Sequence, residues 1–144
     1  MATRISELLH SRSRYAEELS PAALFVGEPA ALGITDLAGL AKAPNVEEAL
    51  ARLTWEVIPV VLCDCAACDG EWRTTIRLLS HAPCRPSVVL VAAGELLQHW
   101  EEVAEAGGYD VLRKPSTPEA LDRIIRSAAS YWRSRRALES AQRW

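Results

Sequence analysis

VVLCD, residues 60–64, is an apolar run that ends in a carboxylate, and it belongs to the strongest predicted strand of this chain. The run does not alternate between polar and apolar residues, which is typical of a parallel strand with both faces covered by helices. Further along, VLRKP at residues 111–115 is a weaker strand-like run that ends in a lysine and a proline. If both runs are parallel strands of one sheet, Asp64 and Lys114 lie at the same edge. Open α/β sheets place their chemistry at that edge, and a carboxylate beside a lysine there can accept a phosphoryl group.

Strand-like and helix-like segments alternate along the rest of the chain. Apolar runs predict strands at residues 22–26, 39–43, 57–63, 87–92 and 109–113. Helical spacing of apolar residues predicts helices at residues 5–19, 46–53, 71–79 and 96–106, and from residue 118 onward. This alternation implies a parallel sheet with right-handed crossovers, that is, an α/β fold.

Two of these helices have recognisable starts. Asn45 can cap the helix that begins at residue 46, with Glu48 three residues after the cap. Thr117 at the N-cap and Pro118 at the first helical position mark the start of the final helix. These residues predict where both helices begin.

The final helix is expected to be long. Its apolar stripe continues to Leu138, well past what one small domain needs. Trp132 lies on this stripe, and exposing it on a free helix would be costly. We therefore expect a helix–helix contact, either in a homodimer or with the N-terminal helix, and keep a solvated C-terminal extension as the alternative.

Composition narrows the class of protein. The chain has 144 residues, 49% of them hydrophobic and 24% charged, which is the balance of a single soluble globular domain. The net charge of −3 does not indicate a nucleic-acid partner. No apolar stretch approaches the ~18 residues needed to span a bilayer, and residues 1–19 lack the apolar centre of a signal peptide. We therefore expect a cytoplasmic protein that binds neither nucleic acid nor membranes.

The cysteines suggest a second, minor interpretation. Thiols in a protein without a secretion signal are expected to be reduced. Cys65 and Cys68 have CxxC spacing, which can ligate a metal or undergo redox cycling, and His81 with Cys84 could complete a tetrahedral zinc site. A second closely spaced ligand pair is missing, however, and Cys63 suits a buried strand position.

Residues 22–127 resemble the receiver domains of response regulators, the CheY-like family. The run at residues 60–64, followed by Asp69-Gly70, looks like the family's phosphoacceptor strand and its downstream Asp-Gly. VVLVAA at residues 88–93 resembles the fourth strand. AEAGGYDVLRKP at residues 104–115 resembles the most recognisable segment, because its helix stop, strand and Lys-Pro all match in register. The resemblance implies a three-layer, flavodoxin-like fold around a five-stranded parallel sheet.

The resemblance also implies a function, namely phosphoryl transfer from a histidine kinase to an aspartate. Asp64 takes the phosphoacceptor position, and Lys114 takes that of the lysine that pairs first with the acceptor and then with the phosphoryl group. Glu28 takes one position of the acidic pair that binds Mg²⁺, and Gly27 takes the other. Pro115 follows the lysine through a bond that the family usually holds cis. The expected partner is a histidine kinase or a phosphotransfer protein, and the domain itself is not expected to be an enzyme.

This sequence also departs from the family pattern. Gly27 removes one expected Mg²⁺ carboxylate, and Ala92 replaces the hydroxyl residue expected at the end of the fourth strand. Val111 stands where the switch aromatic belongs, although Tyr109 lies two residues upstream and is predicted to point to the same face. These departures favour an alternative function, that of a pseudo-receiver, a protein-interaction module that works without phosphorylation.

The first helix of the family is expected to be reduced in this chain. Only residues 29–38 lie between the first two predicted strands. We hypothesise that the N-terminal helix at residues 5–19 fills the groove that results. The expected organisation is an N-terminal helical extension at residues 1–20, a receiver domain at residues 21–127, and an extension of the last helix at residues 128–144.

Overall fold

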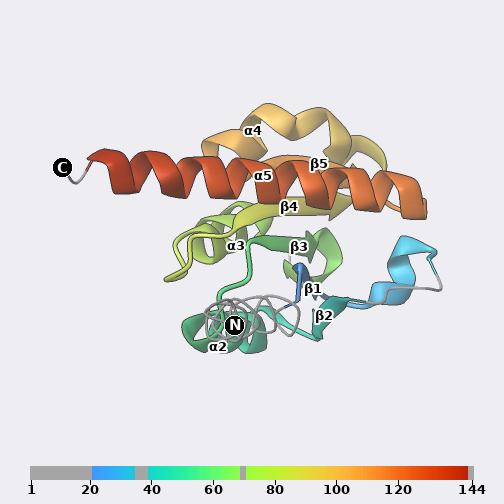
Figure 1. Cartoon of the computed structure of the whole chain (residues 1–144). Coiled ribbons are helices and arrows are strands. Elements are labelled where there is room, and N and C mark those ends of the chain that lie inside the picture. Colours follow the sequence, from blue (N-terminus) through green and yellow to red (C-terminus); the bar gives the residue numbers. More distant parts are fainter. Residues whose placement is uncertain (1–20, 35–38, 69–70, 143–144) are drawn as a thin grey trace, which may run out of the picture.

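The computed structural model describes residues 21–34, 39–68 and 71–142, which form a five-stranded parallel sheet with helices on both faces (Figure 1). The strands are β1 (Ala23–Val26), β2 (Leu40–Ala43), β3 (Val60–Asp64), β4 (Ser87–Ala92) and β5 (Asp110–Arg113). Their spatial order is β2-β1-β3-β4-β5, which is the flavodoxin-like order of doubly wound sheets. The predicted fold class is therefore confirmed.

The two central strands are buried along their whole length. Every residue of β3 and β4 is buried, as the unbroken apolar runs predicted. β4 has the predicted bounds, whereas β3 begins at Val60 instead of Val57. Pro59 explains the later start, since proline has no N–H to donate to a ladder, and Val57 is 52% exposed.

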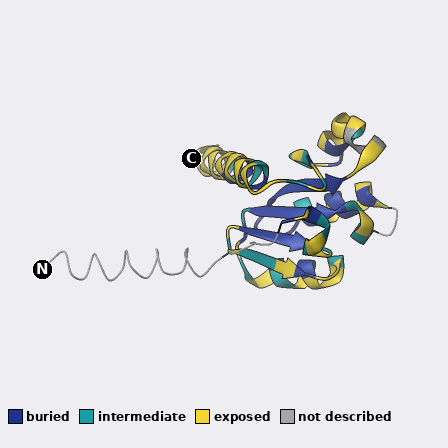
Figure 2. Ribbon diagram, turned by 90° about the vertical axis from the view of Figure 1, so that its right-hand side faces the viewer, coloured by how far each residue is buried: buried dark blue, intermediate teal, exposed yellow. Residues whose placement is uncertain are grey.

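Helices cover the two faces of the sheet unequally. One face packs against α2 (Val46–Trp55), α3 (Trp72–Ser80) and α4 (Trp100–Glu105). The other face packs against α5 (Pro118–Gln142) and the short 3-10 turn η1 (Pro29–Leu32). Two further 3-10 turns, η2 (Cys65–Cys68) and η3 (Gly94–His99), follow β3 and β4. Figure 2 shows the buried sheet between these layers and exposed residues on the outer sides of the helices.

The predicted helix starts are confirmed by side-chain hydrogen bonds. The Asn45 side chain accepts from the backbone N–H of Glu48 at 2.9 Å. The Thr117 hydroxyl accepts from the backbone N–H of Ala120 at 3.1 Å. Both bonds satisfy backbone donors that a helix N-terminus leaves without a partner.

Two helical segments differ from their predicted form. The segment predicted as one helix at residues 96–106 is divided into η3 and α4. Between β1 and β2 the described residues form only η1, in agreement with a reduced first helix. The helix predicted at residues 5–19 lies outside the described residues, and with it the hypothesis that it fills the groove.

α5 runs back across the sheet, from the carboxyl ends of the strands toward their amino ends (Figure 1). Its first half packs against the sheet through residues that include Leu121, Ala128 and Ala129. Trp132 is half-buried, and its indole N–H donates to the backbone carbonyl of Cys84 at 2.9 Å. Trp132 is thus partly covered by its own domain, and the predicted homodimer contact stays a prediction. None of the helices in the described part of the chain is long and apolar enough to cross a bilayer.

Candidate functional site

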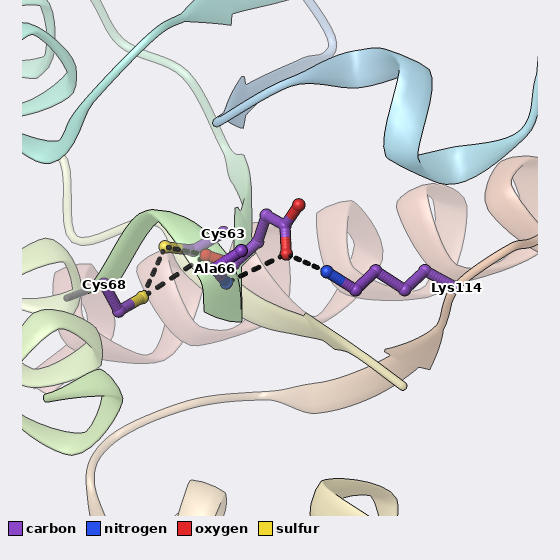
Figure 3. Close-up of polar contacts among 5 residues, drawn as sticks. Cys63, Ala66, Cys68 and Lys114 are labelled. Carbon is purple, nitrogen blue, oxygen red and sulfur yellow. Dashed lines mark hydrogen bonds and ion pairs between the residues drawn. The ribbon is translucent and has the colours of Figure 1, made fainter. Parts of the chain in front are cut away.

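The register of the sheet brings Asp64 and Lys114 together. Asp64 is the last residue of β3 and lies beside Val91 of β4, while Lys114 follows directly after β5. The backbone N–H of Lys114 continues the ladder by donating to the carbonyl of Ala92 at 2.9 Å. As a result, the Lys114 Nζ lies 2.6 Å from the Asp64 Oδ1 (Figure 3).

Asp64 is a buried carboxylate with two donors on one oxygen. Asp64 is 3% exposed. Its Oδ1 accepts one hydrogen bond from the Lys114 ammonium group and another from the backbone N–H of Ala66 at 3.1 Å. A buried charge needs such partners, because desolvation without them is costly. The Lys114 side chain is 21% exposed, so the pair stays within reach of an incoming group.

Gly27 allows the loop after β1 to pass close to Asp64. Its φ of +122° is disfavoured for residues with a side chain. A Cβ on Gly27 would lie 3.0 Å from the Cβ of Asp64 and 3.4 Å from the Cβ of Ala67. A side chain at the position where the family resemblance expects a second Mg²⁺ carboxylate would therefore be crowded and strained in this backbone.

Glu28 lies at the same edge of the sheet but is exposed to solvent. It precedes η1, and its backbone carbonyl accepts from the N–H of Ala31 at 3.0 Å. Among the described residues, no group of three or more His, Cys, Asp or Glu side chains converges on a metal position. Mg²⁺ in proteins often uses only one or two carboxylates and keeps several waters. Glu28 follows β1 and Asp64 ends the neighbouring strand β3, so these two carboxylates are the candidate ligands for Mg²⁺ at this edge.

The residue that ends β4, Ala92, has no hydroxyl group. Ala92 is fully buried and pairs in register with Arg113. Its methyl group can neither donate a hydrogen bond to a phosphoryl oxygen nor accept one from the protein. Ala92 thus cannot make the hydrogen bond to a phosphoryl group that the family resemblance expects from a hydroxyl residue at this position.

The prediction that Tyr109 and Val111 point to the same face is wrong. Val111 packs on the face covered by α2, α3 and α4, whereas Tyr109 packs on the α5 face. The Tyr109 hydroxyl hydrogen-bonds the Ser127 hydroxyl at 2.6 Å, and its ring lies 5.1 Å from that of Tyr131. The reason is that β5 begins only at Asp110, so the alternation of strand side chains does not extend back to Tyr109.

The thiol contact that the structure shows is not the one that the CxxC spacing suggests. The Sγ atoms of Cys63 and Cys68 lie 3.3 Å apart, and the Cys68 thiol also donates to the backbone carbonyl of Asp64 at 3.4 Å (Figure 3). The hydrogen bond with Cys68, together with burial, raises the pKa of the Cys63 thiol far above its usual range. Burial is also the main cause that raises the pKa of Cys65.

These contacts indicate a packing role for the cysteines near Asp64. Thiols with raised pKa values, such as those of Cys63 and Cys65, are poor nucleophiles and poor metal ligands at neutral pH. His81 instead contacts the carbonyl of Arg77 through its Nδ1 at 2.8 Å. Within the described ranges, nothing supports the zinc site considered for Cys65, Cys68, His81 and Cys84.

Comparison with solved structures finds the same fold in receiver domains. A CheY-like response regulator receiver domain from Methanospirillum hungatei JF-1 matches with a TM-score of 0.65 and 19% identity, covering 81% of this chain and 98% of that one. NtrX from Brucella abortus, solved with ADP, matches with a TM-score of 0.66 and 18% identity. That match covers 83% of this chain but only 28% of NtrX, so this chain spans little more than a quarter of that protein.

A structure described as adenylate cyclase from Rhodopirellula baltica also matches, with a TM-score of 0.70 and 15% identity over 84% of this chain and 96% of that one. No model of a known protein family matches this chain, and no curated protein does. At these identities the similarity shows the fold alone. The chain has the fold of a response regulator receiver domain.

Proposed function

We propose that this chain is a receiver domain of a two-component phosphorelay, in which Asp64 accepts a phosphoryl group from a histidine kinase or a phosphotransfer protein. The observation that carries this proposal is the 2.6 Å contact between the Asp64 carboxylate and the Lys114 ammonium at the carboxyl edge of the sheet. The shared fold with receiver domains supports it. On this proposal the domain is the acceptor in the reaction and not an enzyme.

The chemistry requires a carboxylate nucleophile and cations around it. An Asp64 oxygen attacks the phosphorus atom and forms an acyl phosphate, while the bond from phosphorus to the donor's histidine nitrogen breaks and its electron pair returns to that nitrogen. Lys114 is a compact cation close enough to contact the transferred oxygens. The N–H of Ala66 holds the carboxylate in position.

A divalent cation is the second part of this proposal. Mg²⁺ would offset negative charge on the phosphoryl oxygens when bound. Asp64 and Glu28 would hold it together with waters, and because Gly27 supplies no carboxylate we expect the binding to be weak.

The test is phosphorylation by a small donor. Incubation with acetyl phosphate and Mg²⁺ is expected to add one phosphoryl group, measured by intact mass, and Asp64→Asn is expected to abolish the adduct. Asp110→Asn is the matched control, because Asp110 is an exposed strand aspartate whose side chain accepts from the neighbouring N–H of Val111. An adduct that survives Asp64→Asn would contradict the proposal.

A pseudo-receiver is the second candidate function. The observations that favour it are the buried methyl of Ala92 and the packing of Tyr109 against Ser127 and Tyr131, which leave no switch residue of the family pattern at its usual place. A folded wild-type protein with no adduct, and with tryptophan fluorescence that does not respond to Mg²⁺, would support this function and exclude the first.

A further inference from the structure

Three arginines surround a pocket at the amino edge of the sheet, the edge opposite Asp64. The pocket has a volume of about 180 Å³ and lies between the loop that precedes β4 and the C-terminal part of α5. In Figure 1 this part of α5 extends past the amino ends of the strands. The lining residues are Pro83, Cys84, Arg85, Arg135, Arg136, Glu139 and Ser140.

One of these arginines has a buried donor without an acceptor. The Nε of Arg135 is buried and has no hydrogen-bond partner among the described residues. The Nη2 of the same guanidinium group donates to the backbone carbonyl of Arg85. A charged donor that is withdrawn from water without an acceptor is costly and rare in folded proteins. An anion in the pocket would supply the missing acceptor if the guanidinium group turns its Nε toward it.

The loop that carries Arg85 is held in an unusual conformation. Arg85 has a φ of +45°, and among the described residues it is the one non-glycine residue with a positive φ. Its N–H donates to the carbonyl of Ala82 at 2.7 Å, while its carbonyl accepts from Arg135. Backbone strain of this kind is often found where a loop clamps a ligand.

Trp132 fixes the helix side of the pocket. Its indole N–H bonds the carbonyl of Cys84, which lines the pocket, at 2.9 Å. The guanidinium carbon of Arg136 lies 4.8 Å from the centre of the Trp132 ring, within the range of a cation–π contact. Trp132 therefore holds the guanidinium group of Arg136 next to the loop that contains Cys84.

We propose that this pocket binds the phosphate group of a small organic phosphate ester. The guanidinium group is a planar fork of donors that matches phosphate oxygens. Arg85, Arg135 and Arg136 outnumber the one carboxylate in the lining, Glu139, so the pocket has an excess of positive charge. Since one water occupies ~30 Å³, the pocket has room for a phosphate group but not for a large organic group.

A second hollow next to the pocket has room for the organic part of the ligand. Its volume is about 520 Å³, and it shares Arg135 with the arginine pocket. The rest of its lining includes Gly107, Gly108 and the ring pair Tyr109–Tyr131. On this proposal an aromatic ester would place its phosphate on the pocket side of Arg135 and its ring on the side of the tyrosines.

The experiment is a titration followed at Trp132. Inorganic phosphate is added to the whole chain at an ionic strength held constant with sodium chloride, and the NMR signal of the Trp132 indole N–H is recorded. We expect a saturable shift. Arg135→Gln is expected to weaken binding at least tenfold, whereas Arg133→Gln removes the same charge from an exposed position on the same helix and is expected to leave the affinity unchanged.

Phenyl phosphate forms the second arm of the experiment, and it is expected to bind several-fold more tightly than inorganic phosphate. A shift that does not saturate, or that is weakened equally by Arg133→Gln, would overturn the proposed site. Equal affinities for the two compounds would overturn the organic part of the proposal. If Arg135→Gln lowers the melting temperature markedly, Arg136→Gln provides the same comparison without removing the bond to Arg85.

Discussion

The two edges of the sheet differ in how their charges are matched. At the carboxyl edge one carboxylate, Asp64, meets one ammonium group, Lys114, and one backbone N–H. At the amino edge the arginine pocket is lined by three arginines and one glutamate, and the Nε of Arg135 has no acceptor among the described residues. The charges of Asp64 and Lys114 already balance each other, so this pair does not need a further ion. A cluster of guanidinium groups with an excess of positive charge is instead stabilised by binding an anion.

The two edges also differ in what holds them in place. Asp64 and Lys114 are fixed by neighbouring strands and by the close approach of the Gly27 loop. The arginine pocket is held by contacts between a loop and a helix extension, such as the bond from Trp132 to Cys84. Substitutions should therefore affect stability more strongly at the carboxyl edge.

Thiol labelling is expected to show the largest difference. Cys63 is fully buried in β3, and its raised pKa leaves little thiolate at neutral pH. Labelling of Cys63 by iodoacetamide should be at least ~1,000-fold slower than in the unfolded chain, because opening a core strand costs ~4 kcal/mol or more. Cys84, beside the arginine pocket, should react faster. Rates come from peptide mass spectrometry, and equal rates for the two thiols would contradict the comparison.

Gly27→Asp tests the backbone of the carboxyl edge. The new Cβ would meet the Cβ of Asp64 at 3.0 Å, and the φ of +122° would be strained, so we expect a loss of ~3 kcal/mol in the free energy of unfolding. Gly39→Asp is the matched control. Gly39 also has a positive φ but has open space around it, so the loss should be ~1 kcal/mol. Urea denaturation measures both, and equal losses would refute the steric explanation.

Lys114→Met tests the charge pair itself. It leaves a buried carboxylate without its cation, and we expect a loss of ~2 kcal/mol in unfolding free energy. Lys42→Met, an exposed change on the edge strand β2, should stay within ~0.5 kcal/mol of the wild type. Adding Asp64→Asn to Lys114→Met should recover part of the loss, and strictly additive losses would argue against a coupled pair.

Trp132→Phe tests the amino edge and is expected to have the smallest effect. It removes the N–H that donates to Cys84 and should cost ~1 kcal/mol. Trp55→Phe is the control, because Trp55 is 88% exposed and its replacement should change stability by less than ~0.5 kcal/mol. The same change in melting temperature for both variants would mean that the contact between helix and loop contributes nothing.

Patterns within single segments predicted the elements of this fold well. The apolar run at residues 87–92 became β4 with the same bounds, and Asn45 and Thr117 cap their helices as expected. The start of β3 was placed too early, because the apolar run continues through Pro59 although that residue cannot donate to a ladder. Local patterns report burial and capping reliably, and they place element ends less well.

The candidate site was predictable only in part. The alternation of elements was enough to expect Asp64 and Lys114 at one edge, because parallel strands share their carboxyl ends. The contact between the thiols of Cys63 and Cys68 was not predicted, because it depends on the turn between them and not on the CxxC spacing of Cys65 and Cys68. The face on which Tyr109 packs was mispredicted, since it depends on whether β5 begins at residue 109 or 110.

Local sequence patterns were enough to predict the class of fold, the order of the strands along the chain, and the two residues whose charges meet at the carboxyl edge. Those features follow from local periodicity and from the rule that parallel crossovers are right-handed. The close approach of Gly27 to Asp64, and the pocket that Arg85 and Arg135 line together, became visible in the folded chain alone. The reason is that these contacts join segments far apart in the chain, so they depend on how α5 and the loops pack and not on any local pattern.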